Sequence, residues 1–343
     1  MRAAVLSEPR TIAITEVPDA TPAAGHVLVR VAAASICGSD LTGYWGVSAR
    51  TRLPTVPGHE VAGTVAEVGD GVDRSLIGSR VVVEPNVSCR TCRWCLAGLP
   101  NVCPTYRVLG ESMDVPGGLA DLVAVAADQV YELPTEMGFG EGAVIQPLSI
   151  SYHGVVARAE VQAEESVLIV GAGPIGLAAL LIARDLGARC FVSDVVEDRL
   201  DLACRLGAER AIRADVDDVA AVARELTDGA GVDVAIEAVG GVQGSSLADA
   251  ISATRTRGRV LLLGTFGKQP QPIPGYAFKN REMTMLGSHG HPGAFAPTLE
   301  LVRAGRLRPA DLITHELPLT DVAEAFAMLD ERRAGVVKVV LEP

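Results

Sequence analysis

The chain has 343 residues, with 30 basic and 42 acidic side chains and a net charge of −12. This length, at roughly 150 residues per domain, predicts about two domains, and the 48% apolar content allows a packed core and excludes wholesale disorder. The acidic balance argues against a nucleic-acid partner and against binding to an anionic membrane. Residues 1–14 lack the apolar core of a signal peptide, so we expect a cytoplasmic protein.

Before residue 150 the sequence predicts a domain rich in short β-strands. Apolar runs of strand length alternate with glycine and proline, which favour turns between strands. The predicted strands are Val27–Ala33, Val61–Val68, Arg80–Val83 and Leu122–Val125.

The same region carries three segments that suit a catalytic metal: Cys37-Gly-Ser-Asp40, Gly58-His-Glu60 and Gln146-Pro147. A catalytic zinc ion takes about three protein ligands and keeps one position open for water or substrate. Cys37 and His59 are suitable ligands, and Glu60 is a third if the backbone turns at Gly58, because neighbours on a regular strand point to opposite faces. Otherwise Glu60 supports the ligands from behind. Taken singly, Cys37 could be a buried thiol and His59 a core histidine.

Four of the seven cysteines lie within fifteen residues, in the spacing C-x2-C-x2-C-x7-C: Cys89, Cys92, Cys95 and Cys103. Four thiolates around one point suit a tetrahedral structural zinc ion. Disulfides suit a small secreted domain better than this chain, and an iron–sulfur cluster would also use cysteine ligands. The spacing favours zinc over both alternatives. Cys190 and Cys204 stand apart, and we predict both to be small buried apolar side chains.

Beyond about residue 155 the pattern changes to alternating strands and helices. Residues 166–183 carry no charge over 18 positions, which approaches the length of a membrane helix. Gly171-Ala-Gly-Pro174 would break such a helix, so we predict a buried strand, Val167–Val170, and then a helix to about Leu186. This alternation indicates βαβ units with a parallel sheet and no membrane segment. The further predicted strands are Cys190–Asp194, Val232–Val239, Arg259–Leu263 and Met283–Leu286, and the further helices are Asp198–Leu206, Val219–Leu226 and Ser246–Ala253.

The turn after the first of these strands reads Gly171-Ala-Gly-Pro-Ile-Gly176, the G-x-G-x-x-G pattern of a dinucleotide-binding loop. The three glycines would allow a tight turn, close approach of a pyrophosphate, and close packing of helix on strand. The N-terminus of the helix would favour the phosphate charge. Asp194 follows Gly176 by eighteen residues, where a carboxylate binds the ribose hydroxyls of NAD and repels the 2′-phosphate of NADP. The alternative is an ordinary turn with Asp194 as a helix cap.

With these motifs the sequence resembles the zinc-containing medium-chain dehydrogenases and reductases, in their alcohol and polyol dehydrogenase group. Gly58-His-Glu-Val-Ala-Gly63, continuing to Gly69 and Val72, is similar to the zinc signature of that family. The cysteine loop is similar to its structural zinc lobe, and Gly171–Gly176 to its coenzyme fingerprint. The resemblance covers essentially the whole chain. It implies an α/β protein with a GroES-like, β-rich catalytic domain (1–152 and 287–343) and a Rossmann domain with a doubly wound parallel sheet (153–286).

The resemblance also implies roles for single residues. Cys37 and His59 match the ligands of a catalytic zinc, and Glu60 matches a carboxylate that binds this zinc or lies behind its ligands. Ser39 matches a hydroxyl that relays the substrate proton, and Asp40 a carboxylate that orients the zinc histidine. Two zinc ions per chain follow, one catalytic and one structural. The implied NAD contacts are Gly171, Gly173, Pro174, Ile175, Gly176, Asp194 and Arg199.

Two positions depart from the polyol members of the family. Gln146 stands where those members usually have glutamate, and a neutral amide is a weaker ligand that cannot act as a base. This favours a zinc ion held by Cys37, His59 and Glu60, with Gln146 near its water. Thr42 stands where many of those members have histidine.

The substrate pocket is the part that the sequence predicts least. Tyr44 and Trp45 follow the first ligand segment and either line this pocket or pack in the core. His289 and His291 follow the last predicted strand, and two histidines there favour a hydroxyl-rich substrate over a surface loop.

The predicted reaction is the reversible oxidation of a secondary alcohol to a ketone, with zinc and with NAD rather than NADP. A polyol, sugar or cyclitol is the first substrate class, a β-hydroxy amino acid such as threonine the second, and a simple secondary alcohol the third. A scaffold that binds NAD and zinc without turnover is an alternative, and so is the zinc-free quinone-reductase branch, which would lack the metal ligands. From the resemblance we expect a homodimer or homotetramer.

Overall fold

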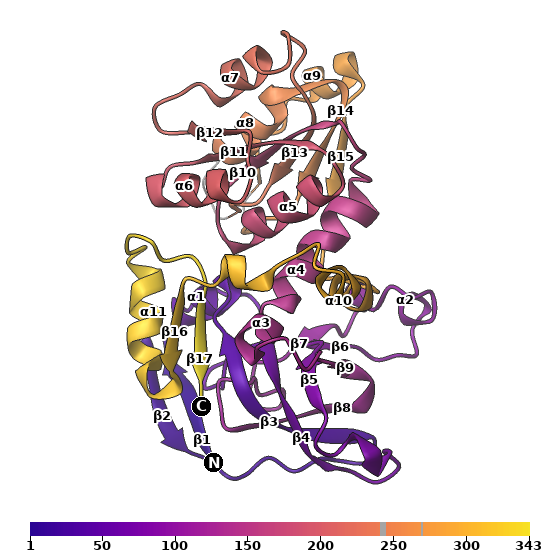
Figure 1. Cartoon of the computed structure of the whole chain (residues 1–343), viewed down its shortest axis with the longest axis vertical. Coiled ribbons are helices and arrows are strands. Elements are labelled where there is room, and N and C mark those ends of the chain that lie inside the picture. The colour runs from indigo at the N-terminus through magenta and orange to yellow at the C-terminus, as the bar shows by residue number, and fades with distance from the viewer. Residues whose placement is uncertain (241–244, 269) are drawn as a thin grey trace. The chain divides into compact units, whose positions relative to one another are not determined.

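The computed structural model describes residues 1–240, 245–268 and 270–343. The chain forms two compact units, one comprising Met1–Gln146 with Phe295–Pro343 and the other Pro147–Ala294 (Figure 1). Helix α4 (Ile145–Tyr152) runs through the first boundary between them. No helix in the described part of the chain is long and apolar enough to cross a membrane.

The first unit is the β-rich one. Its helices are α1 (Gly38–Tyr44), α2 (Arg93–Leu96), α3 (Phe139–Ala143), α10 (Phe295–Arg303) and α11 (Val322–Asp330). Its strands are β1 (Arg2–Glu8), β2 (Thr11–Glu16), β3 (His26–Ser35), β4 (Glu60–Val68), β5 (Arg80–Val83), β6 (Asn86–Val87), β7 (Arg107–Val108), β8 (Leu122–Ala126), β9 (Val130–Glu132), β16 (His315–Pro318) and β17 (Val339–Glu342).

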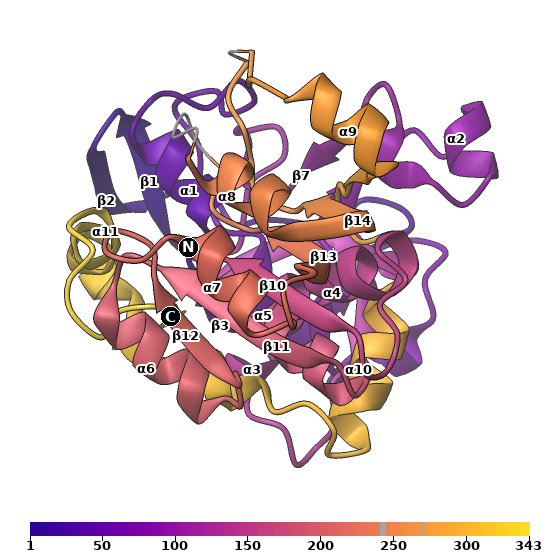
Figure 2. The ribbon, with the colours of Figure 1, turned by 90° about the horizontal axis from the view of Figure 1, so that it is seen from above.

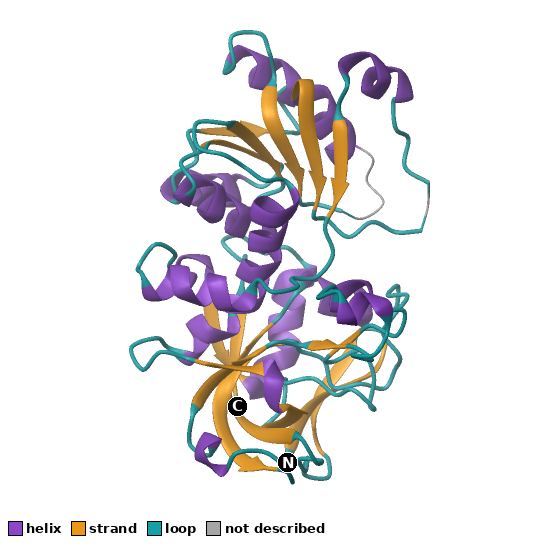
Figure 3. Cartoon of the chain, turned by 90° about the vertical axis from the view of Figure 1, so that its right-hand side faces the viewer, coloured by secondary structure: helices purple, strands orange, loops and turns teal. Residues whose placement is uncertain are grey.

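A seven-stranded, strongly curved sheet forms the centre of this unit (Figure 3). The strand order is β16-β17-β3-β4-β5-β9, and β8 also pairs with β3. Val27, Val29 and Val31 alternate along β3 and belong to one buried cluster, as expected for a strand with one face on the core. Ser35 at the end of β3 faces Glu60 at the start of β4. The pairing therefore brings the segment that begins at Cys37 beside the one that contains His59.

The second unit contains the parallel sheet. Its strands are β10 (Ser166–Val170), β11 (Arg189–Asp194), β12 (Arg210–Arg213), β13 (Val232–Glu237), β14 (Thr254–Leu262) and β15 (Thr284–Gly287). Its helices, besides the greater part of α4, are α5 (Pro174–Asp185), α6 (Glu197–Arg205), α7 (Val219–Glu225), α8 (Ser245–Ala253) and α9 (Gly275–Arg281).

These strands are all parallel and lie in the order β12-β11-β10-β13-β14-β15. The part of this order from β12 to β14 can be followed in Figure 2. Helices α5 and α6 cover one face, and α7, α8 and α9 cover the other (Figure 1). This is the doubly wound Rossmann order, in which the direction of winding reverses between β10 and β13. A dinucleotide binds outside the carboxyl ends of the strands at that reversal, which is where the Gly171–Gly176 loop lies.

Strand β12 was missed by the sequence analysis. It reads Arg-Ala-Ile-Arg, and of these residues only Ile212 is fully buried, so no apolar run marks it. The edge position of β12 in the sheet explains this composition, because its outer side needs no apolar cover. The predicted strand Val232–Val239 ends two residues early, at Glu237, and β14 begins at Thr254, ahead of the predicted Arg259.

Candidate active site and metal centres

Helix α1 follows directly after β3 and carries the first set of predicted site residues. Cys37 is the N-cap of this helix, and its N–H donates to Oδ2 of Asp40 at 2.9 Å. A carboxylate in the first helical turn is stabilised by the free N–H groups there. The other oxygen of Asp40 accepts the N–H of Gly58 at 3.3 Å. Asp40 therefore ties the Cys37 segment to the segment that carries His59.

The chain turns sharply just before His59. Gly58 has φ of +99°, and a side chain there would collide with Leu119, so glycine is required on both counts. Nδ1 of His59 lies 3.5 Å from Oδ1 of Asp40, and Oγ of Ser39 lies 3.4 Å from Nε2. The carboxylate thus fixes the ring and leaves Nε2 as the nitrogen for a metal.

The pKa values of Asp40 and His59 shift in the directions expected for a buried pair of opposite charges. Burial alone would raise the pKa of Asp40, but His59 and the backbone hydrogen bonds lower it. Burial alone would lower the pKa of His59, but Asp40 and then Cys37 raise it well above the usual value. The same negative groups that favour a proton on this ring favour a metal cation in its place.

Glu60 is wholly buried and is held by a lysine that the sequence analysis missed. Nζ of Lys338 lies 2.7 Å from Oε2 and 2.9 Å from Oε1 of Glu60, and the hydroxyl of Ser35 also donates to Oε2. The same Nζ donates to the carbonyl of Ile36 at 3.1 Å, and Lys338 is only 1% exposed. One buried ammonium therefore braces the strand ends that carry both metal-ligand segments.

The structure brings the three predicted ligands of a catalytic metal together. Cys37, His59 and Glu60 each offer one ligand atom, and these atoms lie within 4.8 Å of one another. Thiolate, imidazole and carboxylate are the donors that zinc takes in catalytic sites, so this donor set fits the metal. An ionised carboxylate has about four lone-pair positions, so Glu60 retains acceptor capacity beside its pair with Lys338.

Three further predicted residues lie in or at the edge of the first unit. Gln146 is buried in the first turn of α4, and its role near a zinc-bound water stays a prediction. The ring of Tyr44 packs on Phe326 with 5.1 Å between centroids, and Nε1 of Trp45 donates to Asp330 at 2.7 Å. These contacts of Tyr44 and Trp45 are the ones that the core-packing alternative predicts.

The two predicted substrate histidines lie in the second unit, after β15. His291 is wholly buried, whereas His289 is exposed. The charge of His289 reaches His153, whose pKa is lowered by burial, by Arg158 and by His289. Contact of either residue with a substrate stays a prediction.

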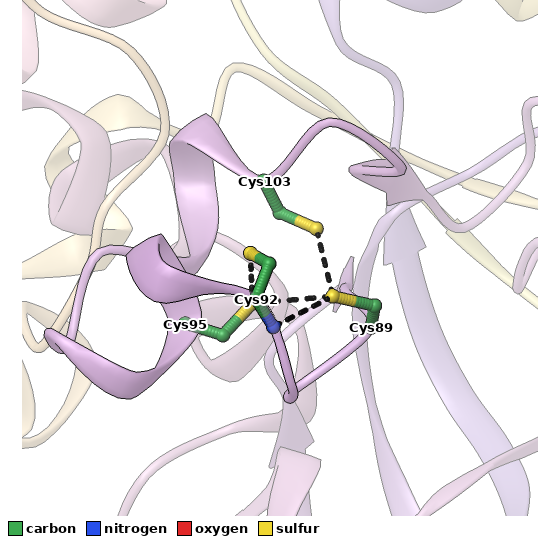
Figure 4. Close-up of side chains that lie close together, drawn as sticks. All are labelled: Cys89, Cys92, Cys95 and Cys103. Carbon is green, nitrogen blue, oxygen red and sulfur yellow. Dashed lines mark hydrogen bonds between the residues drawn. The ribbon is translucent and has the colours of Figure 1, made fainter.

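The cysteine loop directs its four sulfur atoms toward one point (Figure 4). Four sulfurs at about 2.3 Å from a tetrahedral zinc ion would stand about 3.8 Å apart, whereas a disulfide needs about 2.05 Å. All four cysteines are free, which argues against the disulfide alternative. Sulfur atoms this close together can surround a single metal ion, whereas an iron–sulfur cluster of several iron atoms would hold them further apart. The Sγ–Sγ distances are 3.5 Å for Cys89–Cys103, 3.6 Å for Cys92–Cys95 and 3.9 Å for Cys89–Cys95.

The loop also prepares a thiolate. Hydrogen bonds from the backbone of Thr91 and then of Cys92 lower the pKa of Cys89 to about 5, so this ligand is ionised at neutral pH.

The isolated cysteines differ from this loop and from each other. Cys190 is buried, as predicted, and burial raises its pKa to about 12. The prediction for Cys204 was wrong, because this residue is exposed, one position beyond buried Ala203 on α6.

The dinucleotide loop has the geometry that its three glycines predict. Gly171 has φ of +106°, and an added Cβ at Gly176 would lie 1.8 Å from the carbonyl oxygen of Gly171. A Cβ at Gly173 would meet nothing within 4 Å. The first glycine therefore makes the turn, the third lets α5 pack against it, and the second faces open space that suits a pyrophosphate.

Asp194 fixes this loop at the end of β11. Its Oδ2 accepts the N–H of Ala172 at 2.6 Å, and its Oδ1 accepts the N–H of Val196 at 2.9 Å. Arg199 is half-buried in the first turn of α6. The carboxylate thus lies beside the glycine loop, where the ribose of a dinucleotide is bound in this type of fold.

Comparison with known proteins agrees with the metal site of the first unit and with the dinucleotide loop of the second. Residues 23–135 match the family of alcohol dehydrogenase GroES-like domains, and residues 174–304 match the zinc-binding dehydrogenase family. A sorbitol dehydrogenase of Bombyx mori is 35% identical, over 99% of this chain and 97% of that protein. The chain belongs to the zinc-containing medium-chain alcohol and polyol dehydrogenase family. As a member of it, this dehydrogenase is an oxidoreductase that acts on CH–OH groups.

Solved structures confirm the fold of the dehydrogenase. An alcohol dehydrogenase of Escherichia coli CFT073 complexed with NADH has a TM-score of 0.91 and 29% identity, over 100% of this chain and 99% of that one. A putative zinc-binding dehydrogenase of Sinorhizobium meliloti 1021 bound to NADP has a TM-score of 0.92 and 29% identity, with the same coverage. The prediction of a GroES-like domain with a Rossmann domain is therefore correct.

Proposed function

We propose that this dehydrogenase catalyses the reversible oxidation of a secondary alcohol in a polyol, sugar or cyclitol to the ketone, with NAD as the hydride acceptor. The observation that carries the proposal is the approach of the ligand atoms of Cys37, His59 and Glu60 to within 4.8 Å, in a chain with a complete dinucleotide loop. The sorbitol dehydrogenase among the relatives supports a hydroxyl-rich substrate.

The residues around the metal ligands supply the proton chemistry. When bound, zinc would act as a Lewis acid on the alcohol oxygen, and NAD would accept the hydride. Asp40 holds the ring of His59, so that Nε2 stays directed at the metal. Ser39 is exposed and lies 3.4 Å from this nitrogen, so its hydroxyl is placed to accept the alcohol proton and pass it outward.

The preference for NAD over NADP rests on Asp194. Backbone N–H groups bind both of its carboxylate oxygens, so the negative charge is held in one orientation beside the glycine loop. A fixed carboxylate at this position accepts hydrogen bonds from two ribose hydroxyls and repels a 2′-phosphate. One solved relative is complexed with NADH and another is bound to NADP. The preference proposed for this chain therefore rests on its own residues.

Mixing the protein with NAD⁺ and a panel of polyols, cyclitols, threonine and simple secondary alcohols tests the proposal, with NADP⁺ in parallel. We expect NADH formation with a hydroxyl-rich compound and about two zinc ions per chain. Cys37→Ser should lose the catalytic zinc and turnover, whereas the matched control Cys204→Ser, at an exposed cysteine, should keep both. Full zinc content and full turnover in Cys37→Ser would refute the catalytic assignment. Bound zinc and NAD⁺ without turnover on any alcohol would favour the scaffold alternative.

A further inference from the structure

An arginine lies beside the carboxylate that we assign to the ribose. Arg213 at the end of β12 is the register partner of Asp194 at the end of β11. The two strands are parallel neighbours about 4.8 Å apart, and register partners in a sheet point to the same face. Arg213 is therefore near enough to meet a phosphate carried on the 2′-oxygen of that ribose.

The guanidinium of Arg213 is already occupied by two carboxylates. Its Nε and Nη2 bind the two oxygens of Asp215, each at 2.9 Å, and its Nη1 binds Glu197. Glu197 belongs to the first turn of α6, three residues after Asp194, which places the guanidinium beside the turn between β11 and α6. These hydrogen bonds raise the pKa of Arg213, so the group is always charged.

This arrangement disfavours a 2′-phosphate in two ways. A guanidinium binds phosphate best through paired N–H groups, and here these groups are taken by carboxylates. The positive charge of Arg213 is also offset by the two carboxylates that it binds, and its register partner Asp194 adds a third carboxylate nearby. A phosphate monoester with a charge of about −1.5 to −2 would be repelled there.

We propose that Glu197 and Asp215, the carboxylate clamp, keep Arg213 from binding a 2′-phosphate, and that Arg213 without the clamp is a receptor for this group. The clamp then sets the choice between NAD and NADP together with Asp194. The inference rests on the proposed function only in placing the nucleotide at the Gly171–Gly176 loop. It assigns specificity to residues that the glycine motif and Asp194 alone do not predict.

Binding of 5′-AMP and of 2′,5′-ADP to the full chain, measured by calorimetry, tests the clamp without any alcohol substrate. In Glu197→Gln/Asp215→Asn both amides keep the side-chain size, and both positions are well exposed, at 60% and 44% of the side chain, so the fold should persist. We expect the affinity for 2′,5′-ADP to rise about tenfold, as for a newly available charge-assisted pair. The affinity for 5′-AMP should change by less than about twofold, because no 2′-phosphate is involved.

The triple variant Arg213→Met/Glu197→Gln/Asp215→Asn separates a receptor from simple relief of repulsion. It should lose the part of the gain that depends on the guanidinium and keep only what the removal of two negative charges contributes. The proposal is overturned if the double variant shows no gain, or if the triple variant keeps the whole gain. If wild-type protein fails to bind 5′-AMP at all, the nucleotide site itself is wrong, and the proposed function fails with it. Binding of 5′-AMP without a gain in the double variant would overturn the clamp alone.

Discussion

The two candidate metal sites of this dehydrogenase are built on opposite plans. The cysteine loop draws all four ligands from residues 89–103, and its sulfurs take hydrogen bonds from the backbone of the same loop. The centre of Cys37, His59 and Glu60 is held by distant parts of the fold, since Lys338 lies 278 residues from Glu60. A bound metal would organise the first centre, whereas the sheet organises the second before any metal binds. This contrast predicts that the two respond differently to loss of one residue.

The largest effect is expected at the cysteine loop. Cys92→Ser removes one of four thiolates around a single point, and a structural zinc of this kind contributes on the order of 10 kcal/mol to folding of its segment. We expect zinc content to fall from about two to about one per chain, with faster hydrogen exchange over residues 89–103. Cys204→Ser is the control, because this cysteine is exposed and lies on α6. If Cys92→Ser retained both zinc ions, the claim that the four cysteines of this loop hold one of them would be wrong.

The second effect concerns the buried ion pair behind the catalytic centre. Lys338→Met leaves Glu60 buried without its cation, and breaking a buried pair in this way lowers the free energy of unfolding by about 3–5 kcal/mol. Denaturant unfolding measures it, with exposed Lys268→Met as the control, expected to change stability by less than about 0.5 kcal/mol. Lys338→Met/Glu60→Gln should recover part of the loss. Equal stability of the two single lysine variants would show that the fold does not depend on this pair.

What the sequence predicted well was local. The cysteine spacing and the Gly171–Gly176 loop with Asp194 each lie within a short stretch, so residue spacing alone limits their geometry. The helix and strand pattern around them also gave the Rossmann domain, because buried parallel strands read as continuous apolar runs.

What the sequence did not predict was the long-range support of the site. The chain has only three lysines, and Lys338 interrupts the apolar run Val336–Leu341, so a signal of a buried charge was present. Its partner could not be named, because pairing with Glu60 depends on the strand order β17-β3-β4, and no local pattern encodes that order. Arg213 was missed for a similar reason, since edge strand β12 has no apolar run to mark it.

The smallest expected effect concerns Asp40 and the metal affinity of the candidate catalytic site. Asp40 contacts no metal position itself but joins Cys37, Gly58 and His59 through one carboxylate. Asp40→Asn removes the charge that favours a cation on His59, and loss of such a partner weakens metal affinity by about 10–100-fold. Competition with a chromophoric chelator measures this, and the zinc of the cysteine loop serves as an internal reference that should not change. Asp73→Asn is the matched control, because Asp73 also accepts a backbone N–H at a helix start, 2.9 Å from Ser75, but is exposed. If Asp40→Asn bound zinc as tightly as Asp73→Asn, the orientation of His59 would be set by packing alone, and the contrast between the two sites would rest on Lys338.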